Sequence, residues 1–232
     1  MDFFDVVQKR RSVRKFTDQP VDSQLIEKAL DAALVAPNSS NMQPWEFYWV
    51  KSTAHREPLI EACFRQNAAQ SAQELIFVVA RLDTWKRNQK LILNWIDTLD
   101  SPPKVLVNYY KKLIPLAYMR DPFFIKDTLA YLMTTLIGWF RPTPRVSFGT
   151  ARAFETASKS TALACENLML ALVAQGLSCC PMEGFDEVRV KKVLKLNRHS
   201  HVVMGIGIGY AAEDGIYSSQ FRIPRELVVK EV

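Results

Sequence analysis

Three guanidinium groups and one hydroxyl lie within five residues near the start of the chain, at Arg10, Arg11, Ser12 and Arg14. Arginine binds phosphate through paired hydrogen bonds, and a serine hydroxyl with free backbone N–H groups at the end of a short helix adds further donors. The segment therefore suits a phosphate monoester. A solvated basic face or a nucleic-acid patch is the alternative, because basic runs usually lie on a solvent-exposed surface.

A second polar segment runs from Asn38 to Gln43 (NSSNMQ) between Pro37 and Pro44. Short amides and hydroxyls on a loop held between prolines can hydrogen-bond the edge of a heteroaromatic ring or a polyol. We expect Trp45 to anchor this loop to the core. Taken alone, the segment would be interpreted as a turn.

A third candidate is the segment Pro181 to Gly184 (PMEG), where a strand gives way to a helix and Gly184 lets a ligand approach the backbone closely. We interpret the nearby Asp186 only as the N-cap of that helix.

Glycines alternate along a later apolar segment, at Gly205, Gly207 and Gly209. They do not make a dinucleotide-binding fingerprint. They lie inside a strand pattern, the third glycine is not at the spacing that the fingerprint requires, and no helix begins after them. We expect them to permit close packing across the strand.

The cysteines and histidines show no spacing typical of a metal site, so no metal is expected. Cys179 and Cys180 lie in an apolar run and are expected to be buried, reduced thiols, which fits a cytoplasmic protein. The longest apolar stretch, 128–140, has 13 residues and is too short to span a bilayer, which needs about 20. We expect a buried helix or a lid there. The N-terminus lacks the pattern of a secretory signal.

The composition is that of an ordinary globular chain, with 232 residues, 48% hydrophobic and 23% charged. A net charge of +6 is compatible with nucleic acid, an anionic membrane or a phosphorylated ligand. The basic runs at Lys111-Lys112 and 189–195 fall on predicted amphipathic helices, where a solvated face is the usual explanation.

Hydrophobic spacing predicts a mixed α and β fold with a covered sheet. The predicted helices cover 2–9, a segment from Asp22 to before Pro37, 151–175 ended by Gly176, and 186–194. The predicted strands cover 45–50, 75–80, 178–182 and 202–208.

Residues 84–150 are rich in aromatic residues and prolines. We interpret this region as helices packed as a lid rather than as a separate domain. The expected breaks are at Pro102, Pro103, Pro115, Pro122 and Pro142.

Taken in order, the segments RRSVRKF, APNSSNMQPWEF, GLSCCPMEGFD and GIGIGY followed by FRIP resemble the nitroreductase family of FMN-dependent NAD(P)H oxidoreductases. The resemblance implies one α+β domain over 1–232, with a central, mostly antiparallel sheet covered by helices. It also implies a long interface helix, a variable helical lid at about 84–150, and a homodimer with two FMN sites at the subunit interface.

The resemblance further implies roles for individual residues. Arg10, Ser12 and Arg222 would hold the FMN phosphate or ribityl chain, Arg11 would act mainly through its backbone, and Arg14 would lie at the pyrimidine edge. Asn38, Ser39 and Asn41 would reach the flavin from the other subunit. Pro181, Met182, Glu183 and Gly184 would line the ring, with a backbone N–H around Glu183 directed at flavin N5. Ser40, Phe123 and Phe124 would face the substrate.

Three features depart from the family pattern. Asn38 stands where members often have serine, and Gln220 stands where they often have lysine, a loss for which Arg11 could compensate. A polar flavin contact before the second strand could come from Asn67 or Gln70, and Asn67 is favoured.

The resemblance implies hydride transfer from NAD(P)H through flavin N5 to a nitroarene, a quinone or a similar acceptor, by a ping-pong mechanism. Hydride addition leaves negative charge at the flavin N1–C2 edge, which a fixed cation such as Arg14 would stabilise. The alternatives are reductive dehalogenation or flavin fragmentation on the same fold. From a different class, a basic nucleic-acid or anionic-surface binder without flavin remains an alternative.

Overall fold

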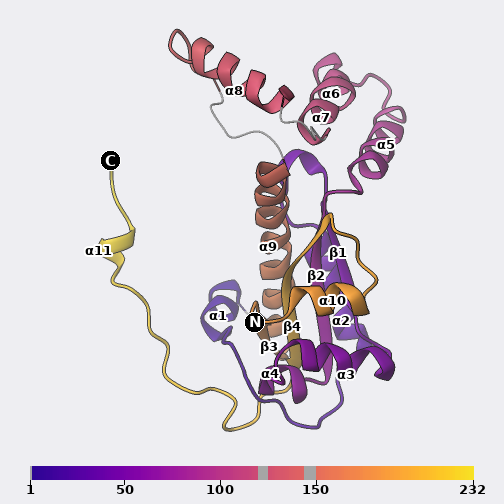
Figure 1. Ribbon diagram of the computed structural model, residues 1–232. Helices are drawn as coiled ribbons and strands as arrows, with labels where there is room; N and C mark the ends of the chain where they lie inside the picture. The colour runs from indigo at the N-terminus through magenta and orange to yellow at the C-terminus, as the bar shows by residue number, and fades with distance from the viewer. Residues whose placement is uncertain (1, 120–124, 144–149) are drawn as a thin grey trace.

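Four antiparallel strands form the central sheet in the order β1-β2-β4-β3 (Figure 1). The computed structural model describes residues 2–119, 125–143 and 150–232. The predicted substrate residues Phe123 and Phe124 lie outside these residues. The strands are β1 (Trp45–Trp49), β2 (Glu74–Arg81), β3 (Ser178–Met182) and β4 (Ser200–Gly209). The predicted α+β class and the antiparallel sheet are confirmed.

Strand β2 is buried on both faces because its apolar residues alternate between two cores. Ile76 and Val78 pack with the helices of one face, whereas Leu75, Phe77 and Val79 pack with those of the other. This double burial explains why its sequence, ELIFVVAR, is almost continuously apolar.

The long helix crosses one face of the sheet and packs against the second helix of the chain. Asp2 and Asp22 accept backbone hydrogen bonds at the first turns of the two N-terminal helices, as expected for N-caps. Gly176, with φ +83°, follows the end of the long helix as predicted. These helices are α1 (Phe3–Lys9), α2 (Ser23–Leu34) and α9 (Thr150–Ala174).

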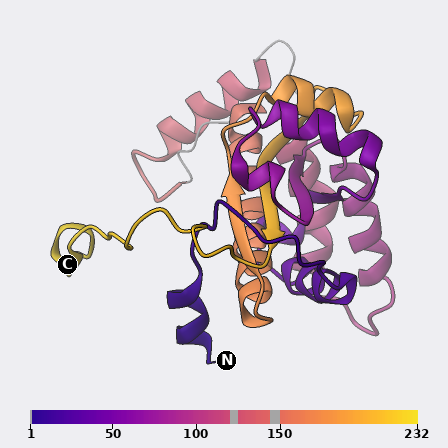
Figure 2. The same cartoon turned by 90° about the horizontal axis from the view of Figure 1, so that it is seen from below.

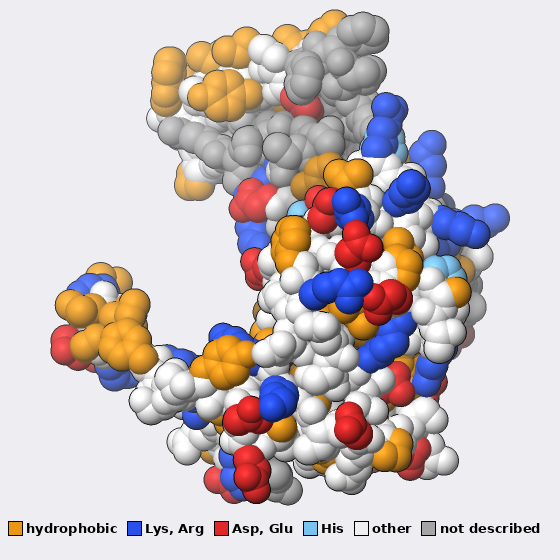
Figure 3. Space-filling model, turned by 60° about the horizontal axis from the view of Figure 1, so that its bottom comes forward, with side chains coloured by type: hydrophobic (Ala, Val, Ile, Leu, Met, Phe, Trp, Pro, Cys, Tyr) orange, Lys and Arg blue, Asp and Glu red, His pale blue; other side chains and the backbone are white. Residues whose placement is uncertain are grey.

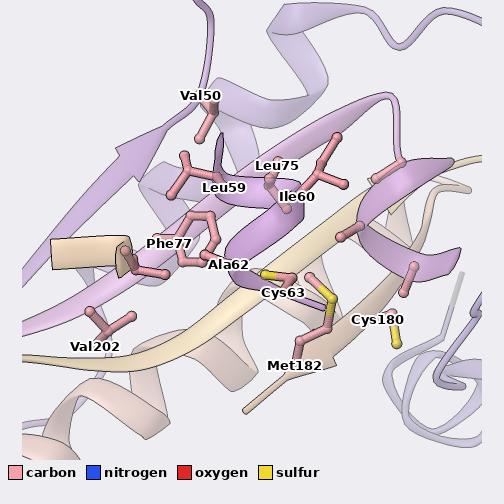
Figure 4. Close-up of a cluster of buried hydrophobic side chains, with 14 of the residues drawn as sticks. Val50, Leu59, Ile60, Ala62, Cys63, Leu75, Phe77, Cys180, Met182 and Val202 are labelled. Atoms are coloured by element: carbon pink, nitrogen blue, oxygen red, sulfur yellow. The ribbon is translucent and has the colours of Figure 1, made fainter. Parts of the chain in front are cut away.

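Three short helices cover the opposite face, and the core beneath them is shown in Figure 4. Asp186 accepts a hydrogen bond from the Arg189 N–H, so its predicted role as an N-cap is confirmed. The helices are α3 (Thr53–Ala62), α4 (Asn67–Gln70) and α10 (Glu187–Val193). Helices α3 and α4 are not among those that the sequence predicts.

The region of the predicted lid is helical, but the expected break at Pro115 is wrong. Helical backbone runs without interruption from Lys104 to Tyr118. A π-helical turn precedes the proline, with the Ile114 N–H bonded to the carbonyl of Tyr109, so Pro115 falls at the start of a new α-helical segment, where its missing N–H is tolerated. The elements are α5 (Trp85–Ile96), α6 (Lys104–Asn108), the π-helix η2 (Tyr109–Leu113), α7 (Ile114–Tyr118) and α8 (Ile125–Ile137).

The apolar stretch 128–140 forms most of α8 and the turn after it, and it is not a buried helix. Leu129, Met133, Leu136 and Trp139 are all exposed. The helix projects from the rest of the protein in Figure 1. In the residues that the structure describes, no helix combines the length and the apolarity needed to cross a bilayer.

The chain after β4 leaves the body as an arm that includes the short helix α11 (Arg225–Val228) (Figures 1 and 2). Its apolar side chains are exposed, and Figure 3 shows them gathered on the projecting arm. Phe3 and Phe4 on α1 are 61% and 72% exposed. Two terminal segments thus present apolar surface that this chain does not cover.

The glycines of β4 permit close packing, as predicted. A Cβ on Gly207 would lie 2.4 Å from the carbonyl oxygen of Ala68, so helix α4 rests directly on the strand backbone. A Cβ on Gly205 would lie 3.1 Å from the ring of Phe77. Gly207 therefore determines how closely α4 approaches the sheet.

We expect Gly207→Ala to lower the free energy of unfolding by about 1–3 kcal/mol, because the added methyl group meets backbone atoms that cannot rotate away. Gly184→Ala is the control, since a Cβ there would have its nearest neighbour at 3.6 Å. Urea denaturation of both variants measures the difference. Equal stability of the two variants would contradict the close approach of α4.

Candidate active site

The basic segment and the C-terminal segment together form a pocket of about 160 Å³. Backbone hydrogen bonds hold the basic segment in place: the Val13 N–H donates to the Cys179 carbonyl at 3.1 Å, and the Arg14 N–H donates to the Gly215 carbonyl at 2.8 Å. The segment is thus fixed between the end of the sheet and the start of the arm. The pocket is lined by Arg10, Arg11, Ser12, Arg14 and residues 216–222.

The pocket carries an excess of positive charge. Arg10 lies 3.9 Å from the Glu166 carboxylate, but within the described ranges no carboxylate lies within 4.0 Å of Arg11, Arg14 or Arg222. The Arg11 guanidinium donates to the Ser218 carbonyl at 2.7 Å, so its side chain contributes to the pocket and not only its backbone. This donor set suits the dianionic phosphate of FMN.

Tyr217 contacts two of the residues predicted to face a flavin ring. The Arg14 guanidinium carbon lies 5.3 Å from the centre of the Tyr217 ring, and the Asn67 amide donates to the Tyr217 hydroxyl at 3.4 Å. The Gln70 amide instead donates to the Arg65 carbonyl at 2.5 Å. Of the two amides considered, Asn67 is therefore the one that reaches the pocket segment. Tyr217 was not among the predicted site residues. The one feature of the sequence that could have pointed to it is its position five residues before Arg222.

The segment at the end of β3 leaves open space beside the backbone. Pro181 and Met182 belong to the strand, and Glu183 and Gly184 after it are exposed. The Gly184 carbonyl accepts a hydrogen bond from the Gln66 amide at 2.5 Å. Apart from the chain neighbours of Gly184, that amide is the one group of the described residues within 4 Å of a Cβ placed there. The glycine is therefore not required by packing among the described residues.

The loop Asn38–Gln43 has a strained backbone. Ser40, Asn41 and Gln43 have φ values of 58°, 48° and 46°, in the left-handed region, which costs a residue other than glycine about 1–2 kcal/mol. The Asn38 side chain accepts a hydrogen bond from the Gln43 N–H at 2.8 Å, and the Ser39 N–H donates to the Ser160 hydroxyl at 3.2 Å. Such strain is typical of functional segments that surrounding contacts hold in place.

Within one chain, this loop and the arginine pocket are separate. Asn41 and Gln43 line a different groove, of about 720 Å³, beside β1, α2 and α5. Figure 1 shows β1 beginning at the end of the sheet opposite to the arginine segment. The predicted site residues thus fall into two groups: one formed by the basic segment, Asn67, the end of β3 and the arm, and the other formed by the loop.

The four cysteines are buried, and their surroundings oppose ionisation. Burial raises the pKa of Cys63 to about 11 and the pKa values of Cys165 and Cys179 to about 12, and it also raises the pKa of Cys180. These thiols are small core residues rather than nucleophiles. Over the described ranges, no group of three or more His, Cys, Asp and Glu residues is arranged to hold a metal ion.

The basic run 189–195 is partly neutralised by ion pairs. Arg189 lies 2.5 Å from Glu61 and 3.3 Å from Asp186, and Lys191 lies 2.9 Å from Glu187. This pattern is that of a solvated helix face, not of a surface prepared for nucleic acid.

The model of the nitroreductase family matches residues 7–210. The chain belongs to the nitroreductase family. An NADH dehydrogenase from Thermus thermophilus is 30% identical, over 95% of this chain and 91% of its own length. A 4-nitrobenzoate reductase from Pseudomonas putida is 26% identical, over 97% of this chain and 92% of its own length. A nitroreductase-family structure from Exiguobacterium sibiricum, solved in complex with FMN, shares the fold with a TM-score of 0.70 at 20% identity, covering 100% of this chain and 98% of its own.

We expect the cysteines of this nitroreductase-family protein to resist iodoacetamide at pH 8, because thiols with raised pKa values are almost entirely protonated there and are shielded from the reagent. Intact-protein mass spectrometry of the native protein should show no adduct. The same protein in guanidinium chloride should show four. Rapid labelling of the native protein would contradict the buried, neutral state of these thiols.

Proposed function

We propose that this protein is an FMN-dependent oxidoreductase that passes reducing equivalents from NAD(P)H to a small acceptor such as a nitroaromatic compound or a quinone. The observation that carries the proposal is the arginine pocket, because it joins motifs from the two ends of the chain into one cationic site. The family membership and the FMN bound to a protein of the same fold support it.

The arginines would hold the phosphate end of the cofactor. Arg10 and Arg222 supply charged donors to phosphate oxygens, and the Ser12 hydroxyl supplies a further hydrogen bond to the phosphate or the ribityl chain. Gln220 lines the same pocket in place of the lysine that is common in the family. The Arg11 side chain also lies in that pocket, and its guanidinium group would replace the positive charge of the absent lysine.

Bound FMN would supply the two-electron redox chemistry, and the chain would supply orientation and charge. Arg14 would hold positive charge at the pyrimidine edge, with Asn67 as a nearby polar contact. The end of β3, from Pro181 to Gly184, would line the ring, with a backbone N–H around Glu183 directed at N5. The open space at Gly184 supports this placement.

A second copy of the chain would complete the site. A pocket of about 160 Å³ is well below the roughly 300–1,000 Å³ typical of sites that enclose a cofactor-sized ligand. Asn38, Ser39 and Asn41 would come from the partner, since in their own chain they lie apart from the arginines. The exposed apolar residues of α1 and of the C-terminal arm are surfaces that such a homodimer would cover.

NAD(P)H and the acceptor would use the same open face of the ring in turn, which is a ping-pong mechanism. Ser40 would lie on the acceptor side, and Phe123 and Phe124 are proposed to contact the acceptor. The 4-nitrobenzoate reductase among the relatives supports a nitroaromatic acceptor.

The purified protein should show flavin absorption bands in the visible range. These bands should bleach on anaerobic addition of NADH or NADPH and return when a nitroarene or a quinone is added. The faster-reacting nicotinamide identifies the preferred donor. A protein that is colourless and also fails to bind added FMN would overturn the proposal.

Arg14→Ala should make the bound flavin harder to reduce, because a fixed positive charge beside the ring edge is lost. We expect the midpoint potential to fall by about 20–60 mV, where 30 mV corresponds to about 1.4 kcal/mol for a two-electron couple. Arg225→Ala, an arginine on α11 outside the pocket lining, is the matched control. Equal potentials in the wild type and Arg14→Ala would remove Arg14 from this role.

A further inference from the structure

Ser40 is held at two atoms by two neighbouring tyrosines. The Ser40 and Tyr109 hydroxyl oxygens lie 2.6 Å apart, and the Tyr110 hydroxyl donates to the Ser40 carbonyl at 2.8 Å. Tyr110 is only 6% exposed, so its hydroxyl needs a partner inside the protein and finds it in this loop. Both contacts fall on a residue whose backbone is in the left-handed region.

Two consecutive residues of the π-helical turn reach one target. Successive side chains of a regular α-helix diverge by about 100°, which directs neighbours to different surroundings. Tyr109 and Tyr110 belong to η2, where the helix is locally widened, and their rings meet edge to face at 5.4 Å and 87°. One phenol reaches the side chain of Ser40, and the other reaches its backbone carbonyl.

The same helices hold the rest of the loop. The Met42 side chain is buried in a cluster with Ile92, Tyr110 and Ile114. The Asn88 amide donates to the Met42 carbonyl at 2.8 Å and to the Gln43 carbonyl at 3.2 Å. Residues 85–118, predicted only as part of a lid, are thus the direct support of the strained loop.

We propose that Tyr109 and Tyr110 are positioning residues of the cofactor site. Their hydroxyls hold Ser40 and thereby keep Ser39 and Asn41 in the conformation in which they reach the flavin bound by the other copy. The proposal rests on the proposed function, because it takes the loop to be a flavin contact. It adds that the helices of the lid region determine how tightly FMN binds.

The test is the dissociation constant of FMN from the apoprotein for Tyr109→Phe and Tyr110→Phe, measured by quenching of flavin fluorescence. Each substitution keeps the ring and removes one hydrogen bond, so we expect binding about three- to ten-fold weaker than in the wild type. Tyr118→Phe is the matched control, since its ring stacks on Trp85 in the same cluster and neither of the two hydroxyls described at Ser40 is its own. The control should bind FMN as the wild type does.

The melting temperature of each apoprotein separates positioning from simple destabilisation. A positioning role predicts weaker FMN binding with a melting temperature close to that of Tyr118→Phe. Wild-type affinity in both Tyr109→Phe and Tyr110→Phe would overturn the proposal, as would a loss of affinity that Tyr118→Phe shares. A wild-type apoprotein that does not bind FMN would instead overturn the proposed function itself.

A double-mutant cycle with Ser40→Ala tests the assignment without altering the helices. Tyr109 contacts the Ser40 hydroxyl, so the effects of Ser40→Ala and Tyr109→Phe on FMN affinity should be less than additive. Tyr110 contacts the backbone carbonyl, which Ser40→Ala retains, so that pair should be close to additive. Full additivity of Ser40→Ala with Tyr109→Phe would show that their contact does not affect cofactor binding.

Discussion

Backbone hydrogen bonds bring like charges together in the arginine pocket, and the candidate site depends on them. Arg10, Arg11, Arg14 and Arg222 would repel one another on a free chain. The segment that carries the first three cannot move away, because Val13 is bonded to β3, Arg14 to Gly215 and Thr17 to Tyr210. Since backbone hydrogen bonds hold the segment, Arg11 and Arg14 keep their positive charge unpaired by any carboxylate of the described residues. The folding free energy of the sheet and its core thus outweighs the repulsion among these arginines. An anionic ligand would reduce that repulsion and stabilise the fold further.

Close contacts with the backbone of the sheet fix the position of the elements that carry the other candidate site residues. Gly207 lets α4 rest on β4, and α4 carries Asn67 toward Tyr217. Residues of β2 fill the cores on both faces of the sheet. Strand β3 lies at the edge of the sheet, and the candidate flavin contacts are at its end. The rigid centre of the protein therefore holds the ligand-facing groups at its margin, where backbone atoms remain accessible.

The strained loop and the exposed apolar surface are the parts of the chain that the proposed second copy would complete. The loop from Asn38 to Gln43 adopts left-handed conformations that the helices of the lid region maintain. Its polar side chains nevertheless lie apart from the arginine pocket of the same chain. The apolar residues of α1 and of the C-terminal arm are exposed, as is expected for surfaces that a partner covers. A second copy would resolve both features at once.

The sequence by itself determined the features that depend on interactions within about four residues. The N-caps at Asp22 and Asp186, the helix end at Gly176 and the apolar strand β2 could be predicted, because local hydrogen bonding, backbone geometry and hydrophobic pattern decide them. The order of the motifs also identified the family and the cationic segment. Only the tertiary structure decided the remaining features, including the helical backbone through Pro115, the exposure of α8 and the contact of Asn67 with Tyr217. It alone joined Arg11 to Ser218 and Ser40 to Tyr109, pairs separated by 207 and 69 residues. Such contacts depend on how whole elements pack, which no local pattern of residues specifies.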